Sequence, residues 1–214
     1  MSDKASHEHS SPILVVISAP SGAGKTTLSQ QILAANPRLT RAITCTTRLP
    51  RKNERDGVDY CFLDAGSFLK RVQAGNFLEH ATVYGHSYGS LKSEVLGKLR
   101  QGKDVLLTVD VQGAKTIRAQ AELEPELKQA LITVFLTTPS MAVLEERLKK
   151  REQDSPAAIQ RRLSVARQEI AQWKLFDYLI ISSTIAEDAR RLQAIIDAEK
   201  MRRHRVAPPE CESA

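Results

Sequence analysis

A buried strand followed by a glycine-rich loop constrains this chain more than any other feature. Residues 13–18 form a run of apolar, mostly β-branched side chains that ends in a serine, which is typical of a strand buried on both faces. Ala-Pro-Ser-Gly-Ala-Gly-Lys-Thr follows at residues 19–26, and helical spacing runs from Lys25 to an Asn-Pro stop. Strand, loop and helix together form a phosphate-binding loop, in which Ala19 replaces the usual first glycine.

The chemistry of such a loop follows from its residue types. Gly22 and Gly24 let the backbone curl until its N–H groups point at phosphate oxygens, and the helix N-terminus adds partial positive charge. Lys25 would reach the β- and γ-phosphates of a nucleotide, and the Thr26 hydroxyl can ligate Mg²⁺. We expect nucleotide binding by Ala19, Pro20, Ser21, Gly22, Ala23, Gly24, Lys25, Thr26 and Thr27. A glycine-rich turn without a ligand is the disfavoured alternative.

Alternating patterns beyond the loop predict an α/β fold. Buried strands are expected at 105–110, 131–136 and 178–181, and helices at 93–100, 112–121, 140–150, 156–173 and 186–201. We therefore expect a P-loop-type parallel sheet flanked by helices. The last core position on the helix at 156–173 would be Trp173.

The region from about residue 41 to residue 89 breaks this alternation. It carries short strand patterns at 42–46, 60–63 and 81–84 and one helix at 65–74. Asp64 is the expected N-cap of that helix, and Gly75 its expected stop. We interpret this region as an inserted lobe with its own small mixed sheet.

Composition narrows the class of protein. The chain has 214 residues, 42% of them hydrophobic, and Lys+Arg exceed Asp+Glu by 31 to 25, so the formal charge is +6. A disordered or membrane-spanning chain is not expected, and an anionic partner is. The three cysteines form no Cys-x-x-Cys pair, which fits a reducing cytoplasm. The basic residues 202–205 are expected to be a solvated helix end rather than an RNA contact.

Two arginines suggest a second anion site. Arg48 and Arg51 flank Pro50, which stiffens the backbone, and paired guanidiniums suit a dianionic phosphate. The hydroxyls of Tyr60 and Tyr88 could add neutral hydrogen bonds. Taken alone, the arginines are equally compatible with a solvated basic loop, and the tyrosines with partial burial in the small lobe.

Several motifs together carry a more specific signal. Thr-Thr-Arg-x-Pro-Arg ends at residue 51, Phe-Leu-Glu ends at residue 79, Tyr-Gly-Ser ends at residue 90, and Val-Asp-x-Gln-Gly-Ala starts at residue 109. Arg-Leu-x-x-Arg at 147–151 and Arg-Leu at 162–163 flank a short polar segment. In order and spacing, the chain from about residue 12 to residue 205 resembles guanylate kinases of the bacterial type, which belong to the nucleoside monophosphate kinases.

This resemblance implies ATP as phosphoryl donor, with Mg²⁺, and GMP as acceptor, with dGMP as a second one. It implies a GMP site made of Thr44, Arg48, Arg51, Tyr60, Glu79, Tyr88, Ser90 and Asp110. It implies catalytic roles for Lys25, Arg48, Arg147, Arg151 and Arg162. Thr26 would hold the Mg²⁺, with Asp110 reaching it through water.

The guanine contact also has an independent chemical basis. Guanine presents N1–H and its 2-amino group side by side, which are two donors for one carboxylate. Adenine lacks this pair, so a buried Glu79 would be left unpaired with AMP. The attacking phosphate oxygen is already anionic, so the transfer needs no general base. A solvated surface acid is the alternative interpretation of Glu79.

The sequence patterns and the resemblance together predict a division of the chain. We expect a disordered leader at 1–12, a kinase domain at 13–205 and a flexible tail at 206–214. Within the domain we expect a core (13–40, 91–147 and 164–205), a GMP-binding lobe (41–90) and a lid (148–163). Small-molecule substrates, a cytoplasmic location and no nucleic-acid or membrane partner are expected, and both a monomer and a homo-oligomer are compatible with the sequence.

Three alternatives and two departures accompany this interpretation. The intact Lys25-Thr26 disfavours a non-catalytic guanylate-kinase-like module that binds protein. An aromatic content of 5% disfavours a nucleic-acid-binding protein. Glu79 disfavours another P-loop small-molecule kinase. Thr108 stands where many family members have an acid. Ser182 stands where the family contacts adenine.

Overall fold

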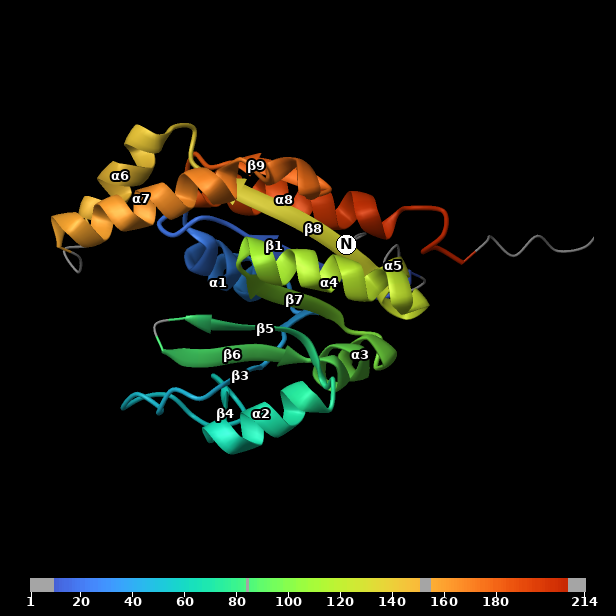
Figure 1. Cartoon of the computed structure of the whole chain (residues 1–214). Coiled ribbons are helices and arrows are strands. Elements are labelled where there is room, and N and C mark those ends of the chain that lie inside the picture. The colour runs from blue at the N-terminus through green and yellow to red at the C-terminus, as the bar shows by residue number, and fades with distance from the viewer. Residues whose placement is uncertain (1–9, 84, 151–154, 208–214) are drawn as a thin grey trace, which may run out of the picture.

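Two sheets organise the computed structural model, which describes residues 10–83, 85–150 and 155–207 (Figure 1). The larger sheet has five parallel strands in the order β2-β7-β1-β8-β9. Its strands are β1 (Leu14–Ser18), β2 (Leu39–Arg41), β7 (Asp104–Val109), β8 (Leu131–Thr137) and β9 (Tyr178–Ile181). Because β1 lies between β7 and β8, the loop after β1 emerges at the carboxyl edge of the sheet, at the point where strand order reverses.

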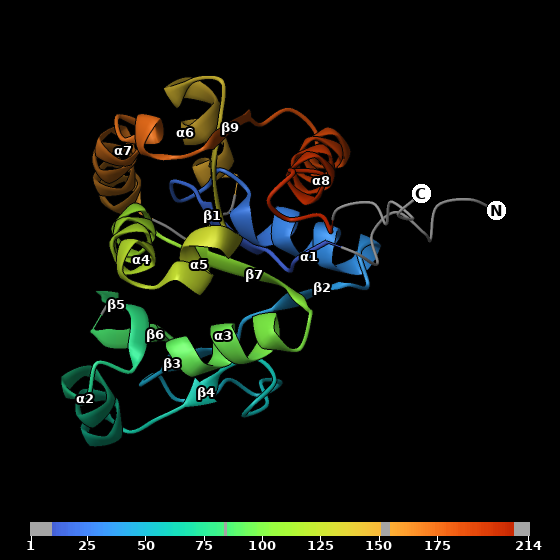
Figure 2. The ribbon, with the colours of Figure 1, turned by 90° about the vertical axis from the view of Figure 1, so that its right-hand side faces the viewer.

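Helices cover both faces of this sheet, as Figure 2 shows. Helices α1 (Lys25–Ala35) and α8 (Ile185–Lys200) lie on one face, and α4 (Val111–Leu123) and α5 (Pro125–Ala130) on the other. Helix α3 (Lys92–Arg100) packs near β7, between the two sheets. Helices α6 (Met141–Lys149) and α7 (Pro156–Ile170) pack around the phosphate loop, whose Ala19 and Ala23 share their hydrophobic cluster.

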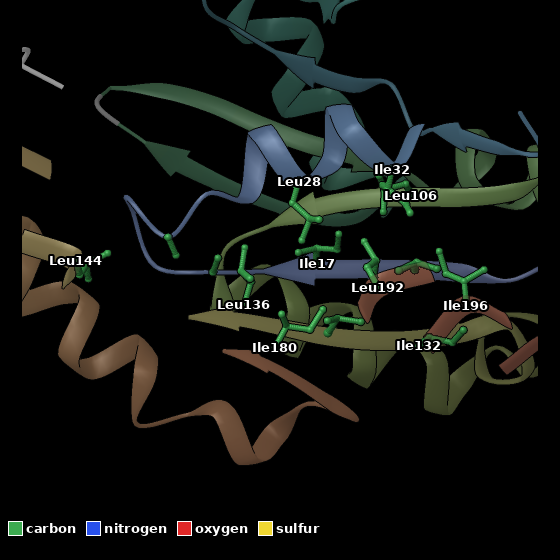
Figure 3. Packing of buried hydrophobic residues seen from close by; sticks show 14 of the residues in the cluster. Ile17, Leu28, Ile32, Leu106, Ile132, Leu136, Leu144, Ile180, Leu192 and Ile196 are labelled. Atoms are coloured by element: carbon green, nitrogen blue, oxygen red, sulfur yellow. The ribbon is translucent and has the colours of Figure 1, made fainter. Parts of the chain in front are cut away.

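Strand β1 explains why the first apolar run is unbroken. Val15 and Ile17 belong to the cluster under α1 and α8, whereas Leu14 and Val16 belong to the cluster under α4 and α5, and all four are fully buried. Figure 3 shows Ile17 packed among side chains from α1, β7, β8, β9 and α8. A strand with neighbours on both faces needs apolar residues at successive positions.

The smaller sheet is mixed and has the order β4-β3-β6-β5. Its strands are β3 (Thr44–Thr46), β4 (Cys61–Phe62), β5 (Phe77–Val83) and β6 (His86–Leu91), and helix α2 (Ala65–Gln73) packs on it. As predicted, Asp64 caps α2 by accepting a hydrogen bond from the Ser67 N–H at 2.8 Å. The predicted α/β class, with a parallel sheet and a second small mixed sheet, is confirmed.

Several local features of the structure differ from the predictions. Helix α7 ends at Ile170, and Trp173 begins a short 3₁₀ turn and is 41% exposed, so the predicted core position is wrong. The hydrogen bond from the Gln172 N–H to the Glu169 carbonyl tightens the helix end and turns the chain away from the apolar face. Strands β2 and β6 and helix α5 were not predicted. The predicted strand at 81–84 is the end of the longer β5, and residue 84 lies outside the described residues.

A buried polar network joins the two ends of the described chain. Asp104, at the start of β7, accepts hydrogen bonds from the Ile13 N–H at 2.9 Å and from Lys200 Nζ at 2.7 Å. Arg205 pairs with Glu199, and both are buried, whereas residues 202–204 are exposed, so the predicted solvated end at 202–205 is wrong only at Arg205. The backbone of residue 10 forms a bridge with residue 206. None of the helices in the described ranges is both long and apolar enough to cross a membrane.

Candidate active site

The phosphate loop has the backbone geometry that its glycines predict. Gly22 and Gly24 have φ angles of 95° and 104°, a region that side chains with a Cβ avoid, and Gly24 is the N-cap of α1. A Cβ on Gly22 would lie 2.9 Å from Leu148 Cδ2, so α6 also packs directly beneath the loop. The loop is therefore preset by its backbone and braced by a neighbouring helix.

Lys25 lies between the loop and the end of β7. Its Nζ donates a hydrogen bond to the Val109 carbonyl oxygen at 2.7 Å. Burial lowers the pKa of Lys25, and the nearby carboxyl groups of Asp110, Glu169 and Glu79 oppose this shift. A buried cation at the carboxyl edge of a parallel sheet is well placed to bind an anionic ligand.

A cleft of about 680 Å³ runs from the phosphate loop to the small sheet. Much of the predicted site lines it: Ala19, Pro20, Ser21, Gly22, Gly24, Lys25, Thr26, Thr44, Tyr60, Glu79, Tyr88, Asp110 and Arg162. The predicted phosphate-binding and guanine-binding residues thus share one cavity, although they lie far apart in the sequence.

A bulge in β5 aims Glu79 into this cleft. The pairing between β5 and β6 shifts between Phe77 and Glu79, which sets Glu79 opposite Ser90. Glu79 is 6% exposed and accepts a hydrogen bond from Ser90 Oγ at 2.7 Å. Burial raises the pKa of Glu79, the hydrogen bond from Ser90 opposes this shift, and the charge of Asp110 adds to it.

Two glycines make room for this arrangement. A Cβ on Gly113, in the first turn of α4, would lie 3.1 Å from Glu79 Oε2. A Cβ on Gly89 would lie 2.8 Å from Phe77 Cδ1, in the aromatic stack of Phe77 on Phe68 behind the sheet. Gly89 lies in the motif that ends at residue 90, and Gly113 in the motif that starts at residue 109. At both positions, another side chain occupies the space that a Cβ would need.

Arg48 and Arg51 do not line the cleft in this structure. Arg48 Nη2 makes a bidentate ion pair with Glu54, at 2.8 and 2.9 Å, and lies over the ring of Tyr60 at 5.4 Å. Glu54 also accepts a hydrogen bond from the Arg51 N–H at 2.8 Å, while the Arg51 side chain is exposed. Glu54 therefore holds the loop that carries both arginines.

Arg147 and Arg162, two of the arginines predicted to be catalytic, lie in different places. Arg162 Nη1 donates to Ser21 Oγ at 3.3 Å, on the rim of the cleft. Arg147 lines a second pocket of about 530 Å³, formed by Pro139, Val143, Arg147, Ile181, Ser182, Ser183 and Arg191. Its guanidinium donates to the Ala23 carbonyl in the phosphate loop at 3.2 Å. Arg151 lies outside the described residues.

Asp110 follows β7 and caps α4, because its Oδ1 accepts a hydrogen bond from the Gly113 N–H at 2.6 Å. Thr108, two residues earlier, also lines the cleft. Among the described residues there is no group of three or more His, Cys, Asp or Glu that could hold a metal ion alone. A divalent ion here would rely on a hydroxyl, a carboxylate, water and phosphate oxygens, which is the pattern that Mg²⁺ favours.

Four charged cleft residues were missed by sequence reasoning: Arg41, Asp59, Arg161 and Glu169. Arg41 donates to the carbonyl oxygens of Val58 and Asp59 and so fastens the loop before Tyr60 to the core sheet. No local pattern marks it, since β2 has only three residues. Glu169 lies one turn beyond Val165 and two turns beyond Arg162 on one face of α7, so helical spacing could have found it.

Comparisons with known proteins agree with one another. A family model for guanylate kinase matches residues 11–199. Guanylate kinase of Coxiella burnetii is 44% identical over 190 residues, which is 89% of each chain. That of Carboxydothermus hydrogenoformans is 41% identical over 194 residues, 91% of this chain and 92% of the relative. The crystal structure of guanylate kinase from Anaplasma phagocytophilum superposes with a TM-score of 0.71 at 29% identity and covers 95% of this chain and 93% of its own.

Proposed function

The chain belongs to the guanylate kinase family, and we propose that it transfers the γ-phosphoryl group of ATP to GMP in the cleft between its two sheets. One observation carries this proposal most directly. A buried carboxylate, Glu79, faces the same cavity as a phosphate loop with an intact lysine. A purine with two adjacent hydrogen-bond donors and the phosphates of a nucleoside triphosphate can therefore bind side by side in this cavity.

The donor nucleotide lies on the phosphate loop in this proposal. Backbone N–H groups between Ser21 and Thr27 bind its phosphates at the N-terminus of α1, and Lys25 approaches the transferred group. Since the small sheet lines the other end of the cleft, the base of ATP enters the second pocket. Arg147 joins these two parts of the donor site, because it lines that pocket and contacts the loop at Ala23.

The acceptor lies on the small sheet. Ionised Glu79 accepts hydrogen bonds from N1–H and the 2-amino group of guanine, while Ser90 fixes the carboxylate from its other side. Thr44 lies beside Ser90 across the β3–β6 pair and adds a hydroxyl. Tyr60 and Tyr88, whose ring centroids are 6.3 Å apart, bind the GMP phosphate together with Arg48 and Arg51.

Arg48 lies over the ring of Tyr60, a residue that lines the cleft. Its Nη2 is paired with Glu54 and its Nη1 donates to the Leu49 carbonyl oxygen at 2.7 Å, so a phosphate must replace or share these partners. Glu54 also restricts the conformations of the Arg48 side chain. This arrangement predicts that Glu54 organises the phosphate contact without touching the ligand.

Transfer then proceeds by positioning and charge neutralisation. The acceptor phosphate oxygen is anionic, so no side chain has to remove a proton before attack. Lys25 and Arg162 stabilise charge on the moving group, and α7, which carries Arg162, shields it from water. Thr26 and Asp110 fit a Mg²⁺ ion bound to the ATP phosphates, Asp110 through water, and the ion would neutralise charge on the phosphate oxygens.

A direct assay tests the proposal. Purified protein is mixed with Mg²⁺ and ATP and, in turn, with GMP, dGMP, AMP, CMP or UMP, and ADP formation is followed. Turnover with GMP should exceed turnover with AMP by about 10⁴-fold. Equal turnover with GMP and AMP would contradict the role of Glu79. GMP binding without any ADP formation would favour the non-catalytic module.

A further inference from the structure

Asp188 is a buried carboxylate that lies outside the cleft. It stands in the first turn of α8, is 3% exposed, and makes no salt bridge in the described part of the chain. Both of its oxygens accept hydrogen bonds, Oδ2 from Ser182 Oγ at 2.6 Å and Oδ1 from the Ser183 N–H at 3.0 Å. A buried charge that is satisfied by neutral donors is costly, and such groups are retained where they hold a specific geometry.

The first of these bonds fixes the direction of the Ser182 hydroxyl. A serine hydroxyl has a single proton to donate, and here that proton points to Asp188. The lone pairs of Ser182 Oγ are therefore free to accept, and Arg147 Nη1 donates to this oxygen at 3.1 Å. The carboxylate thus reaches Arg147 through one hydroxyl.

The second bond fixes a neighbouring backbone acceptor. The Ser183 N–H is bound to Asp188, and the Ser183 carbonyl oxygen accepts a hydrogen bond from Arg147 Nη2 at 3.4 Å. One carboxylate therefore holds two adjacent groups, and each of them binds a different nitrogen of the same guanidinium. The guanidinium is fixed as a plane and not merely attracted as a charge.

Arg147 in turn connects this network to the donor site. Its Nη1 also binds the Ala23 carbonyl in the phosphate loop, and a Cβ on Gly24 would lie 4.0 Å from that nitrogen. Ser182, Ser183 and Arg147 all line the second pocket. Removing Asp188 would leave the guanidinium free to rotate at the junction of loop and pocket.

We propose that Asp188 is a positioning residue for the donor nucleotide, which acts through Ser182 and Ser183 to hold Arg147 between the phosphate loop and the second pocket. The inference rests on the proposed function, in which that loop and pocket bind ATP. Asp188 itself touches neither nucleotide. Its loss should weaken the use of ATP and leave the use of GMP unchanged.

The test is Asp188→Asn, which keeps the size of the side chain but cannot accept at both oxygens. One of its two oxygens becomes an N–H donor. If this N–H faces the Ser183 N–H, that contact is lost; if it faces Ser182 Oγ, the hydroxyl proton must turn away from residue 188 and toward the Arg147 guanidinium. We expect KM for ATP at saturating GMP to rise about tenfold, and KM for GMP at saturating ATP to stay within twofold. Calorimetric titration with ATP alone should show the same loss of affinity.

Asp197→Asn is the matched control. Asp197 is another carboxylate of α8, and it accepts from Gln193 Nε2 at 2.8 Å without lining either pocket. The loss of thermal stability in this variant should be no larger than in Asp188→Asn, and both KM values should stay unchanged. Equal changes in the KM values of ATP and GMP in Asp188→Asn, or an unchanged KM for ATP, would overturn the inference.

Ser182→Ala keeps the test decisive if Asp188→Asn does not fold. It removes the hydroxyl alone and should raise KM for ATP about threefold. An unchanged KM for ATP in this variant would also overturn the inference. Failure of the proposed function has a different signature, since the unmodified protein would then form no ADP from ATP and GMP.

Discussion

The two sides of the cleft are built by different means. The phosphate-loop side consists of backbone N–H groups, two glycines with left-handed φ and a helix N-terminus, and α6 packs beneath it. The small-sheet side consists of side chains that hold one another, as Ser90 holds Glu79 and Glu54 holds Arg48. The first side is fixed before a ligand arrives, whereas the second side has groups whose present partners the ligand must replace or share.

This difference separates two tasks. Phosphates are alike in every nucleotide, so a site made from backbone and one lysine can bind them without reading the base. Recognition of guanine needs donors and acceptors in one pattern, which only side chains can supply. Substitutions that act on one side alone can test whether the two tasks are separate.

Lys25→Ala should have the largest effect. It removes the cation nearest the transferred group, so kcat with ATP and GMP should fall by at least about 10³-fold. GMP affinity, measured by calorimetry, should change less than about twofold, because the small sheet supplies its contacts. Lys115→Ala, at an exposed position of α4, is the control. A parallel loss of GMP affinity would show that the two sides are not separate.

Glu79→Gln should rank second and reverse the pattern. The amide turns an N–H group toward a guanine donor, so kcat/KM for GMP should fall by about 10²- to 10³-fold. KM for ATP should stay nearly constant, and the preference for GMP over AMP should shrink. Ser90→Ala removes only the supporting hydrogen bond and should cost about tenfold or less. Equal damage to ATP and GMP use would argue against the guanine contact.

Gly22→Ala should test the bracing of the phosphate loop. The new Cβ meets Leu148 and also requires a left-handed φ of 95°, so the free energy of unfolding should drop by about 3 kcal/mol. Gly102→Ala is the matched control, since its φ is 73° and no atom lies within 4 Å of its Cβ. It should lose about 1 to 2 kcal/mol. Equal losses in urea titrations would mean that α6 does not brace the loop.

The smallest effect concerns the pH dependence of stability, through Glu79 on the small-sheet side. Burial raises the pKa of Glu79 above its usual 4.5, so the folded protein holds that proton more tightly than the unfolded chain does. The contribution of Glu79 to stability is therefore present below pH 4.5 and lost as pH rises through the raised value. Relative to the unmodified protein, Glu79→Gln should gain stability over this range and then stay level. A difference that does not change with pH would contradict the burial effect.

Much of the fold was readable because its signals are local. The run at residues 13–18, the loop glycines and the alternation of strands with helices depend on neighbours in sequence. The three-residue β2 and the six-residue α5 have too few positions to show a period. The prediction for Trp173 is wrong because it continues the helical spacing past the end of the helix. No proline or glycine in the sequence marks the tight turn that follows.

The candidate site was predictable in parts for the same reason. The loop motif by itself predicts phosphate binding. The other cleft residues were found through the resemblance to a known family and not through periodicity. Neither route revealed Arg41 or the network of Asp188, Ser182 and Arg147, because those contacts join residues whose positions are set by tertiary packing. The roles of Arg147 and Arg162 in catalysis stay predictions.

The bridge between residues 10 and 206 brings the two ends of the described chain together at a place away from the cleft. The Ser11 N–H donates to the Arg205 carbonyl at 2.7 Å, next to the start of β1, whereas the phosphate loop follows the opposite end of that strand. A short linker could replace the segments beyond this bridge, and new ends could open at the exposed turn around Gly102. Such a circular permutant would begin with β7 and end with α3, with every cleft residue still held by the same neighbours.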